Sequence, residues 1–134
     1  MSKDRVLGLM ALRERARMAV TLADLREVKR QKDEADRVVA RLGEALSRQG
    51  GGPGIRLASE IMAERAMTAQ LTAEIERQRD RLAALASRVA EEQAKLALQE
   101  QRQQKLVDEA GLARRNLAAE KLATREAAMP ARRR

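Results

Sequence analysis

Apolar residues recur at alternating steps of three and four along almost the whole chain. Starting at Leu7, these steps visit twelve positions up to Leu46, and nine of the twelve are apolar. Starting at Leu57, they visit eighteen positions up to Leu117, and twelve are apolar. A strand would alternate with a period of two, whereas a repeat near 3.5 sustained over many turns is typical of a coiled coil. We therefore expect an all-α fold.

A glycine-rich segment, Gln-Gly-Gly-Gly-Pro-Gly at residues 49–54, interrupts this pattern once. Three consecutive glycines and a proline stop a helix, and a connection this short returns the chain antiparallel. The sequence thus predicts a two-helix antiparallel coiled-coil hairpin with a longer second helix, forming one domain over residues 1–129. A parallel coiled coil between chains is the alternative, but it leaves the glycines unexplained. The predicted segments are a helix over residues 2–49, a turn over 50–54, a helix over 55–129 and a basic disordered tail over 130–134.

The composition excludes most kinds of catalytic site. The chain has no Cys, His, Trp, Tyr or Phe. Disulfides, zinc clusters, cysteine nucleophiles and histidine acid–base chemistry all need residues from this set. The acidic pairs Glu91-Glu92 and Asp108-Glu109 are adjacent, so on a helix their side chains point about 100° apart and form no catalytic dyad. We expect no enzyme activity, cofactor, metal or small-molecule ligand.

No segment is apolar enough to span a membrane. The longest stretch without a charged residue has eight residues, Ala66–Ala73, whereas a membrane helix needs about 20 apolar residues. The first five residues also lack the apolar stretch of a signal peptide. We expect a cytoplasmic protein.

The two predicted helices are unequal in length. If they pair outward from the turn, the first helix ends opposite a position near Gln103, and about 25 residues of the second helix project beyond it. This overhang is rich in alanine and poor in large apolar residues. Because a lone helix is marginal in water, we expect the overhang either to fray or to be held by a partner.

Basic residues concentrate at two places in the chain. The formal net charge is +8, and residues 102–134 alone carry nine basic and four acidic side chains, a net of +5. A second cluster, Arg13, Arg15 and Arg17, lies near the start of the first helix. An antiparallel hairpin would bring both clusters to one end, where they could contact an acidic partner or nucleic acid. The alternative is the ordinary solvated surface of an arginine-rich protein.

The methionines have two interpretations. They are flexible fillers of irregular gaps between helices. Alternatively, Met10, Met62 and Met67 form an adhesive surface for partner helices.

A basic hairpin of this size, with a glycine-containing loop near residue 50 and a longer second arm, resembles the FliJ family. These are the stalk proteins of the flagellar type III export ATPase, and the YscO-type proteins of injectisomes are similar in shape. The resemblance covers nearly the whole chain and is strongest in the second helix. It rests on residues 75–78 (IERQ), 95–102 (KLALQEQR), 119–121 (AEK) and 125–129 (REAAM).

The resemblance implies a non-enzymatic coupling protein whose two ends contact different partners. The open end would enter the pore of the hexameric export ATPase, and the loop end would face the cytoplasmic part of the export-gate membrane protein. Export chaperones would bind as well, and the protein would lie peripherally at the inner face of the cell membrane through the export apparatus. On this basis we assign ring contacts to Arg13, Arg15, Arg17, Arg114, Arg115, Lys121 and Arg125. Gate contacts are assigned to Arg41, Leu42, Leu46, Arg48 and Leu57.

Two other functions stay open at this point. A pI near 10.9 fits a nucleic-acid-binding helical protein, whose binding would weaken steeply with salt. The 20 acidic residues, spread along both helices, argue against it. A homo-oligomeric coiled-coil scaffold is the third possibility, and it predicts a mass in solution well above 14.9 kDa.

Overall fold

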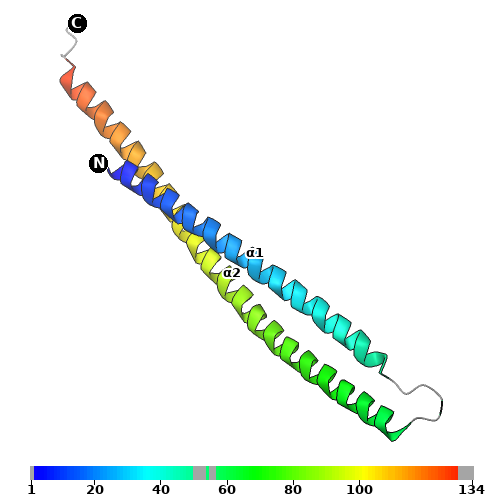
Figure 1. The fold of residues 1–134 in the computed structure, drawn as a ribbon. Coiled ribbons are helices and arrows are strands. Elements are labelled where there is room, and N and C mark those ends of the chain that lie inside the picture. Colours follow the sequence, from blue (N-terminus) through cyan, green and yellow to red (C-terminus); the bar gives the residue numbers. More distant parts are fainter. Residues whose placement is uncertain (1, 50–53, 55–56, 130–134) are drawn as a thin grey trace. The chain divides into compact units, whose positions relative to one another are not determined.

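A computed structural model describes residues 2–49, 54 and 57–129. It consists of two helices, α1 (Lys3–Ser47) and α2 (Ala58–Ala128), which pack against each other (Figure 1). No strand occurs within these residues, which confirms the all-α class. The predicted turn, apart from Gly54, and the predicted tail over 130–134 lie outside the described residues.

Both helices end where a run of helix-forming residues ends in the sequence. Ala, Leu, Glu, Arg and Gln, all strong helix formers, dominate α1 and α2. The last turn of α1 tightens, because the Gln49 amide donates to the Leu46 carbonyl at 3.1 Å. At the start of α2, the Glu60 amide donates to the Leu57 carbonyl at 3.0 Å. Between the helices, Gly54 has a φ of 142°, a backbone conformation that favours glycine.

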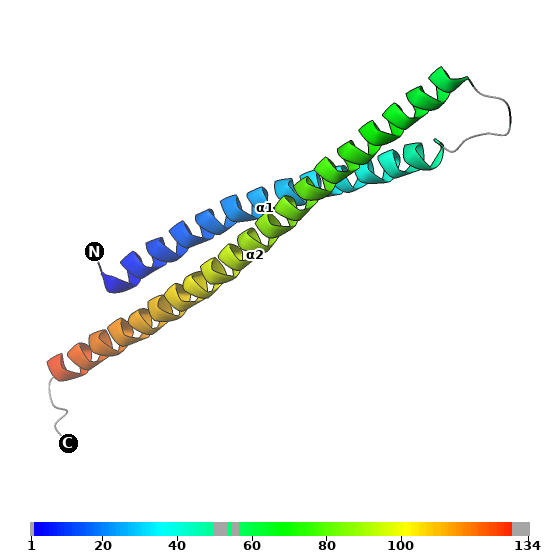
Figure 2. The ribbon, with the colours of Figure 1, turned by 90° about the horizontal axis from the view of Figure 1, so that it is seen from below.

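The contacts divide the chain into two compact units. Unit 1 comprises Met1–Leu22 and Ala94–Arg134, and unit 2 comprises Ala23–Gln93. Each unit therefore contains a part of α1 and a part of α2. In unit 1, the first residues of α1, blue in Figures 1 and 2, run beside the yellow and orange part of α2.

The interface between the helices in unit 2, which we call its seam, has an apolar centre. Val28, Ala35 and Leu85 are buried together, and Leu82 and Val89 pack against them. Full burial of a Val or Leu side chain contributes about 1.5–3 kcal/mol. Leu25 and Ile75 are also buried in unit 2.

The seam of unit 1 is polar and small by comparison. Its buried residues are Ala11, Glu14, Thr21, Gln99 and Ala110. The Thr21 hydroxyl donates to the Arg17 carbonyl at 3.2 Å, one turn back in the same helix. Glu14 Oε1 and Gln99 Oε1 are buried without a hydrogen-bond partner. A buried polar atom without a partner is destabilising, but unit 2 has two as well, Gln78 Oε1 and Glu92 Oε2. Unit 1 differs in that the only apolar residues it buries are alanines, so we expect its seam to hold the helices less strongly.

The three-and-four spacing correctly predicts which residues face the seam. Every buried residue in the described part of the chain lies on one of the two predicted series of positions. The buried residues are Ala11, Glu14, Thr21, Leu25, Val28, Ala35, Ile75, Leu85, Gln99 and Ala110.

The predicted overhang is too long. Within unit 1, Ser2, Lys3 and Asp4 line a cavity with residues that extend to Leu117 and Glu120 of α2. Pairing thus continues well beyond Gln103, and the fully exposed stretch that follows it comprises only residues 118–129 of the described chain. The prediction failed because it began the pairing at a tight turn. In unit 2, the start of α2 is exposed through Ala63, so pairing begins further along that helix.

Candidate protein-interaction surfaces

All seven basic residues assigned to ring contacts belong to one unit. α1 presents the first three within Met1–Leu22, and α2 presents the other four within Ala94–Arg134, so all lie in unit 1. Each side chain is exposed. The structure therefore brings the two basic clusters onto the same unit. The residues are Arg13, Arg15, Arg17, Arg114, Arg115, Lys121 and Arg125.

A shallow groove in unit 1 joins these clusters across the two helices. Arg15 of α1 and Arg114 of α2 both line it, and its volume is about 220 Å³. Leu12 and Val107 supply its exposed apolar walls. Guanidinium groups beside apolar surface are suited to an acidic protein partner, because arginine combines charge with planar hydrogen-bond donors.

Only one of the three arginines near the start of α1 has an ion-pair partner. Arg17 Nη1 lies 3.7 Å from Glu14 Oε2. Glu14 is nine-tenths buried in the seam, so Arg17 serves to neutralise it. Within the described residues, Arg13 and Arg15 form no ion pair and stay available for a partner.

Lys121 and Arg125 lie on the part of α2 that extends past α1. They line a shallow depression with Leu117, Glu120 and Thr124. The Thr124 hydroxyl donates to the Glu120 carbonyl at 2.9 Å within the helix. Every residue from 118 to 129 is exposed, so this segment is helical without a seam of its own.

The residues assigned to gate contacts all fall in unit 2, with unequal exposure. Arg41, Arg48 and Leu57 are exposed, so their side chains are accessible to a partner. Leu42 and Leu46 are half-buried on the predicted seam positions of α1. Their surface is thus divided between the seam and solvent.

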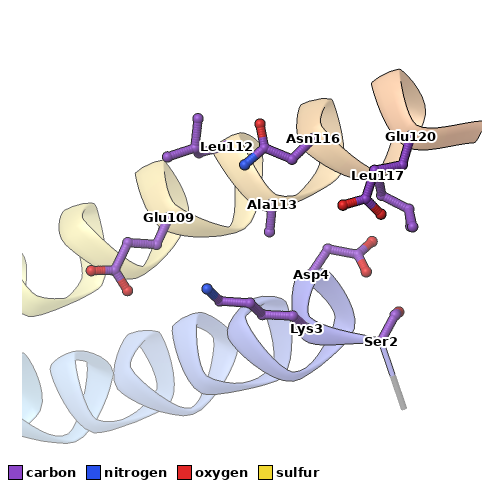
Figure 3. A pocket seen from close by; sticks show the side chains of 9 residues that line it. All are labelled: Ser2, Lys3, Asp4, Glu109, Leu112, Ala113, Asn116, Leu117 and Glu120. Atoms are coloured by element: carbon purple, nitrogen blue, oxygen red, sulfur yellow. The ribbon is translucent and has the colours of Figure 1, made fainter. Parts of the chain in front are cut away.

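A cavity of about 350 Å³ lies where α1 begins (Figure 3). Ala113 and Leu117 of α2 point toward the start of α1, while Leu112 points away. Asp4 lies in this cavity, and the Ser2 hydroxyl, by hydrogen bonding to the carboxylate, holds its pKa below the ordinary value. Carboxylates of Asp4, Glu109 and Glu120 line the cavity with one lysine. No group of three or more acidic side chains close enough to hold a metal occurs among the described residues.

Three methionines that could have filled the seams do not do so, whereas Met18 is half-buried at a predicted seam position. Met10, Met62 and Met67 are all exposed, so the interpretation as packing residues is wrong for these three. Met10 belongs to unit 1, whereas Met62 and Met67 belong to unit 2. They therefore contribute exposed apolar surface to two separate units.

Sequence reasoning missed an apolar surface on the outside of α1. Leu9, Leu12, Ala16, Ala19 and Val20 are all exposed. We call these five residues the outer stripe. At 100° per residue they centre nearly opposite the seam positions of α1. The signal was present in the sequence, because positions 9, 12, 16 and 19 repeat the steps of three and four on a second face.

Comparisons with protein-family models, with curated proteins and with solved structures find no match to this chain. No helix among the described residues has both the length and the apolar character that crossing a membrane requires.

Proposed function

We propose that this protein is a non-enzymatic stalk of a type III export ATPase. The observation that carries the proposal is the collection of all seven candidate ring-contact cations on the exposed surface of unit 1. A stalk needs one end that a ring of subunits can bind and a body that transmits motion from that end. In this proposal the partner ATPase hydrolyses ATP, and this protein couples that hydrolysis mechanically to export.

The proposal includes an antiparallel coiled-coil hairpin, and the contacts inside each unit support it. In unit 1, Ser2–Asp4 share a cavity with residues 109–120, whereas Gly8–Arg15 share a groove with residues 103–114. In unit 2, Val28 and Ala35 pack with residues 82–89, whereas Gln49 lies beside residues 61–69. In both units, later residues of α1 lie near earlier residues of α2, which is the order that opposite helix directions produce.

We propose a different partner for each unit. The hexameric export ATPase would contact unit 1, and the cytoplasmic part of the export-gate protein would contact Arg41, Arg48 and Leu57 in unit 2. Export chaperones complete the set. The protein would then lie in the cytoplasm, at the inner face of the membrane, through these partners.

The first test measures ATP hydrolysis by the purified hexameric export ATPase of the source organism. The full chain should stimulate it, and a variant with Arg13→Glu, Arg15→Glu and Arg114→Glu should not, because like charge would repel an acidic ring lumen. The matched control reverses three exposed arginines of unit 2, at positions 79, 81 and 88. Both variants change the net charge equally. Equal stimulation by the two variants would contradict the proposed contact, and no stimulation by the wild type would contradict the function.

A truncation separates the exposed end of α2 from the paired part. Removing residues 118–134 deletes the helical stretch that lies past the seam, together with Lys121 and Arg125. We expect the helix signal per residue to be retained and ATPase stimulation to fall. Full stimulation by the truncated chain would place the ring contact elsewhere in unit 1.

A further inference from the structure

The outer stripe of α1 is an exposed apolar surface, and of its residues only Leu12 also lines the groove shared with α2. Leu9 is 52% exposed, Leu12 61% and Val20 63%, although each lies within the helix α1. The stripe spans about 16 Å of helix at 1.5 Å per residue, which is about three turns. A contiguous apolar surface of this kind on a helix marks a place where another element docks.

The shape of the stripe fits another helix. Ala16 and Ala19 lie between the larger Leu12 and Val20, so the middle of the stripe is low and its ends are raised. Helices approach to about 8–10 Å depending on the side chains at the contact, and alanines allow the closer end of this range. An amphipathic helix that presents apolar residues at positions i, i+3, i+4 and i+7 can fill such a stripe.

The charges around the stripe determine what kind of helix it accepts. On a helical projection, Arg13 and Arg17 border one edge, and Arg15 borders the other. All three are exposed. Between residues 5 and 23 the only acidic side chain is Glu14, which is buried in the seam. Both edges of the stripe are therefore positive up to Val20, with the exposed Asp24 one turn beyond it, and these edges complement a partner with acidic edges.

The same charges disfavour a second copy of this chain. If two outer stripes met face to face, in either relative direction, arginines would border both sides of the contact. Like charges placed together across an interface oppose association. A membrane surface is also disfavoured, because the chain has no aromatic residue to anchor it and two of the five stripe residues are alanines with little apolar area.

We propose that the outer stripe binds an amphipathic α-helix of a partner protein, with an apolar face seated on Leu9, Leu12 and Val20 and acidic residues along both edges. Arg13 on one edge and Arg15 on the other pair with those acidic residues. This docking does not depend on the export-ATPase assignment, because it follows from the exposure and charge of α1 alone. It adds apolar contact to unit 1, where the only fully buried apolar residues are alanines.

The test uses the full chain and a designed probe. The probe is a labelled, end-capped peptide of about three heptads, with Leu and Ala on one face and Glu along both edges. Binding is measured by fluorescence anisotropy at physiological salt. A second peptide with Lys in place of every Glu, and a third with Ser in place of every Leu, should each bind at least about tenfold more weakly.

Variants of the chain locate the binding surface. Leu9→Ser, Leu12→Ser and Val20→Ser together should weaken binding of the Glu peptide by about tenfold or more, because they remove exposed apolar area without touching the seam. Ala16→Lys, which blocks the low middle of the stripe, should act in the same direction. The matched control is Leu98→Ser, since Leu98 is 54% exposed on α2 of the same unit. It should leave the affinity unchanged.

Several results would overturn the proposal. They are equal binding of the Glu and Lys peptides, equal effects of the stripe and control variants, and no binding of the Glu peptide. If light scattering shows that the wild-type chain is a dimer and that the stripe variant is a monomer, the stripe binds a second copy of this chain. If the wild-type chain binds anionic phosphatidylserine vesicles, the stripe variant does not, and the peptide fails to bind, the stripe contacts a membrane instead. A variant with only Leu9→Ser and Val20→Ser keeps every arginine and changes no residue of the groove that Arg15 and Arg114 line. Loss of peptide binding with normal ATPase stimulation in this variant separates the stripe from the charge-based ring contact.

Discussion

Unit 1 and unit 2 share the same helical repeat, but they bury different kinds of side chain in their seams. Unit 2 buries Val28 and Leu85 in its seam, and its outer surface carries Arg30, which hydrogen-bonds to Glu27 at 2.8 Å and to Glu34 at 3.1 Å. Unit 1 buries polar and small residues in its seam and exposes the outer stripe. The comparison teaches that a coiled-coil period fixes which residues face the partner helix, but the side chains at those positions decide how strongly the helices hold together.

Truncating a large seam residue of unit 2 should have the largest effect on stability. Leu85→Ala should lower the free energy of unfolding by about 2–4 kcal/mol, because it leaves a cavity beside Val28 and Ala35. Urea denaturation followed by circular dichroism measures the change. Leu98→Ala removes the same atoms from an exposed position and should stay within about 0.5 kcal/mol of wild type. Similar losses for both variants would remove the distinction between seam and surface.

Replacing a polar seam residue of unit 1 should have the opposite sign. Gln99→Leu removes a buried amide oxygen that has no hydrogen-bond partner and adds apolar area to the seam. We expect the free energy of unfolding to rise by about 1–2 kcal/mol. The converse change in unit 2, Leu85→Gln, should destabilise the protein. If Gln99→Leu also destabilises, then Gln99 sets the helix register, and the seam of unit 1 is not the weaker one.

The smallest effect should come from the exposed ion pairs of unit 2. Hydrogen bonds from Arg30, and then from Gln31, lower the pKa of Glu27 to about 2 from its ordinary value of 4.5. Because the folded-state pKa is the lower one, the stabilisation is present above pH 4.5 and is lost as the pH falls from 4.5 toward 2.

Glu27→Gln should therefore lower the melting temperature slightly at neutral pH and leave it unchanged near pH 2. Thermal unfolding followed by circular dichroism between pH 2 and pH 7 measures this difference. The matched control is Glu76→Gln, because Glu76 is an exposed carboxylate of the same unit with no ion pair in the described part of the chain. A constant difference between wild type and Glu27→Gln at all pH values would contradict the assigned pKa.

The seam could be predicted from the sequence, whereas the register and the surfaces could not. The steps of three and four place Val28, Leu85 and Gln99 correctly, because burial in a helix pair follows directly from helical periodicity. Register depends on where each helix ends and on the length of the connection, and the exposed start of α2 shifted the pairing away from the expected position at Gln103. The outer stripe was missed because the seam accounts for one apolar face of a helix, and a second face such as Leu9 and Leu12 is recognised only once the first is assigned.

The central claim is that the seam of unit 2 holds the helices together and that unit 1 is the more easily opened part. Native-state hydrogen exchange read by mass spectrometry tests it most directly, because exchange reports the free energy of local opening. The amides of residues 25–42 and 75–92 should exchange at least about tenfold more slowly than those of residues 5–21 and 96–117. Equal protection in the two units, or slower exchange in unit 1, would contradict the account.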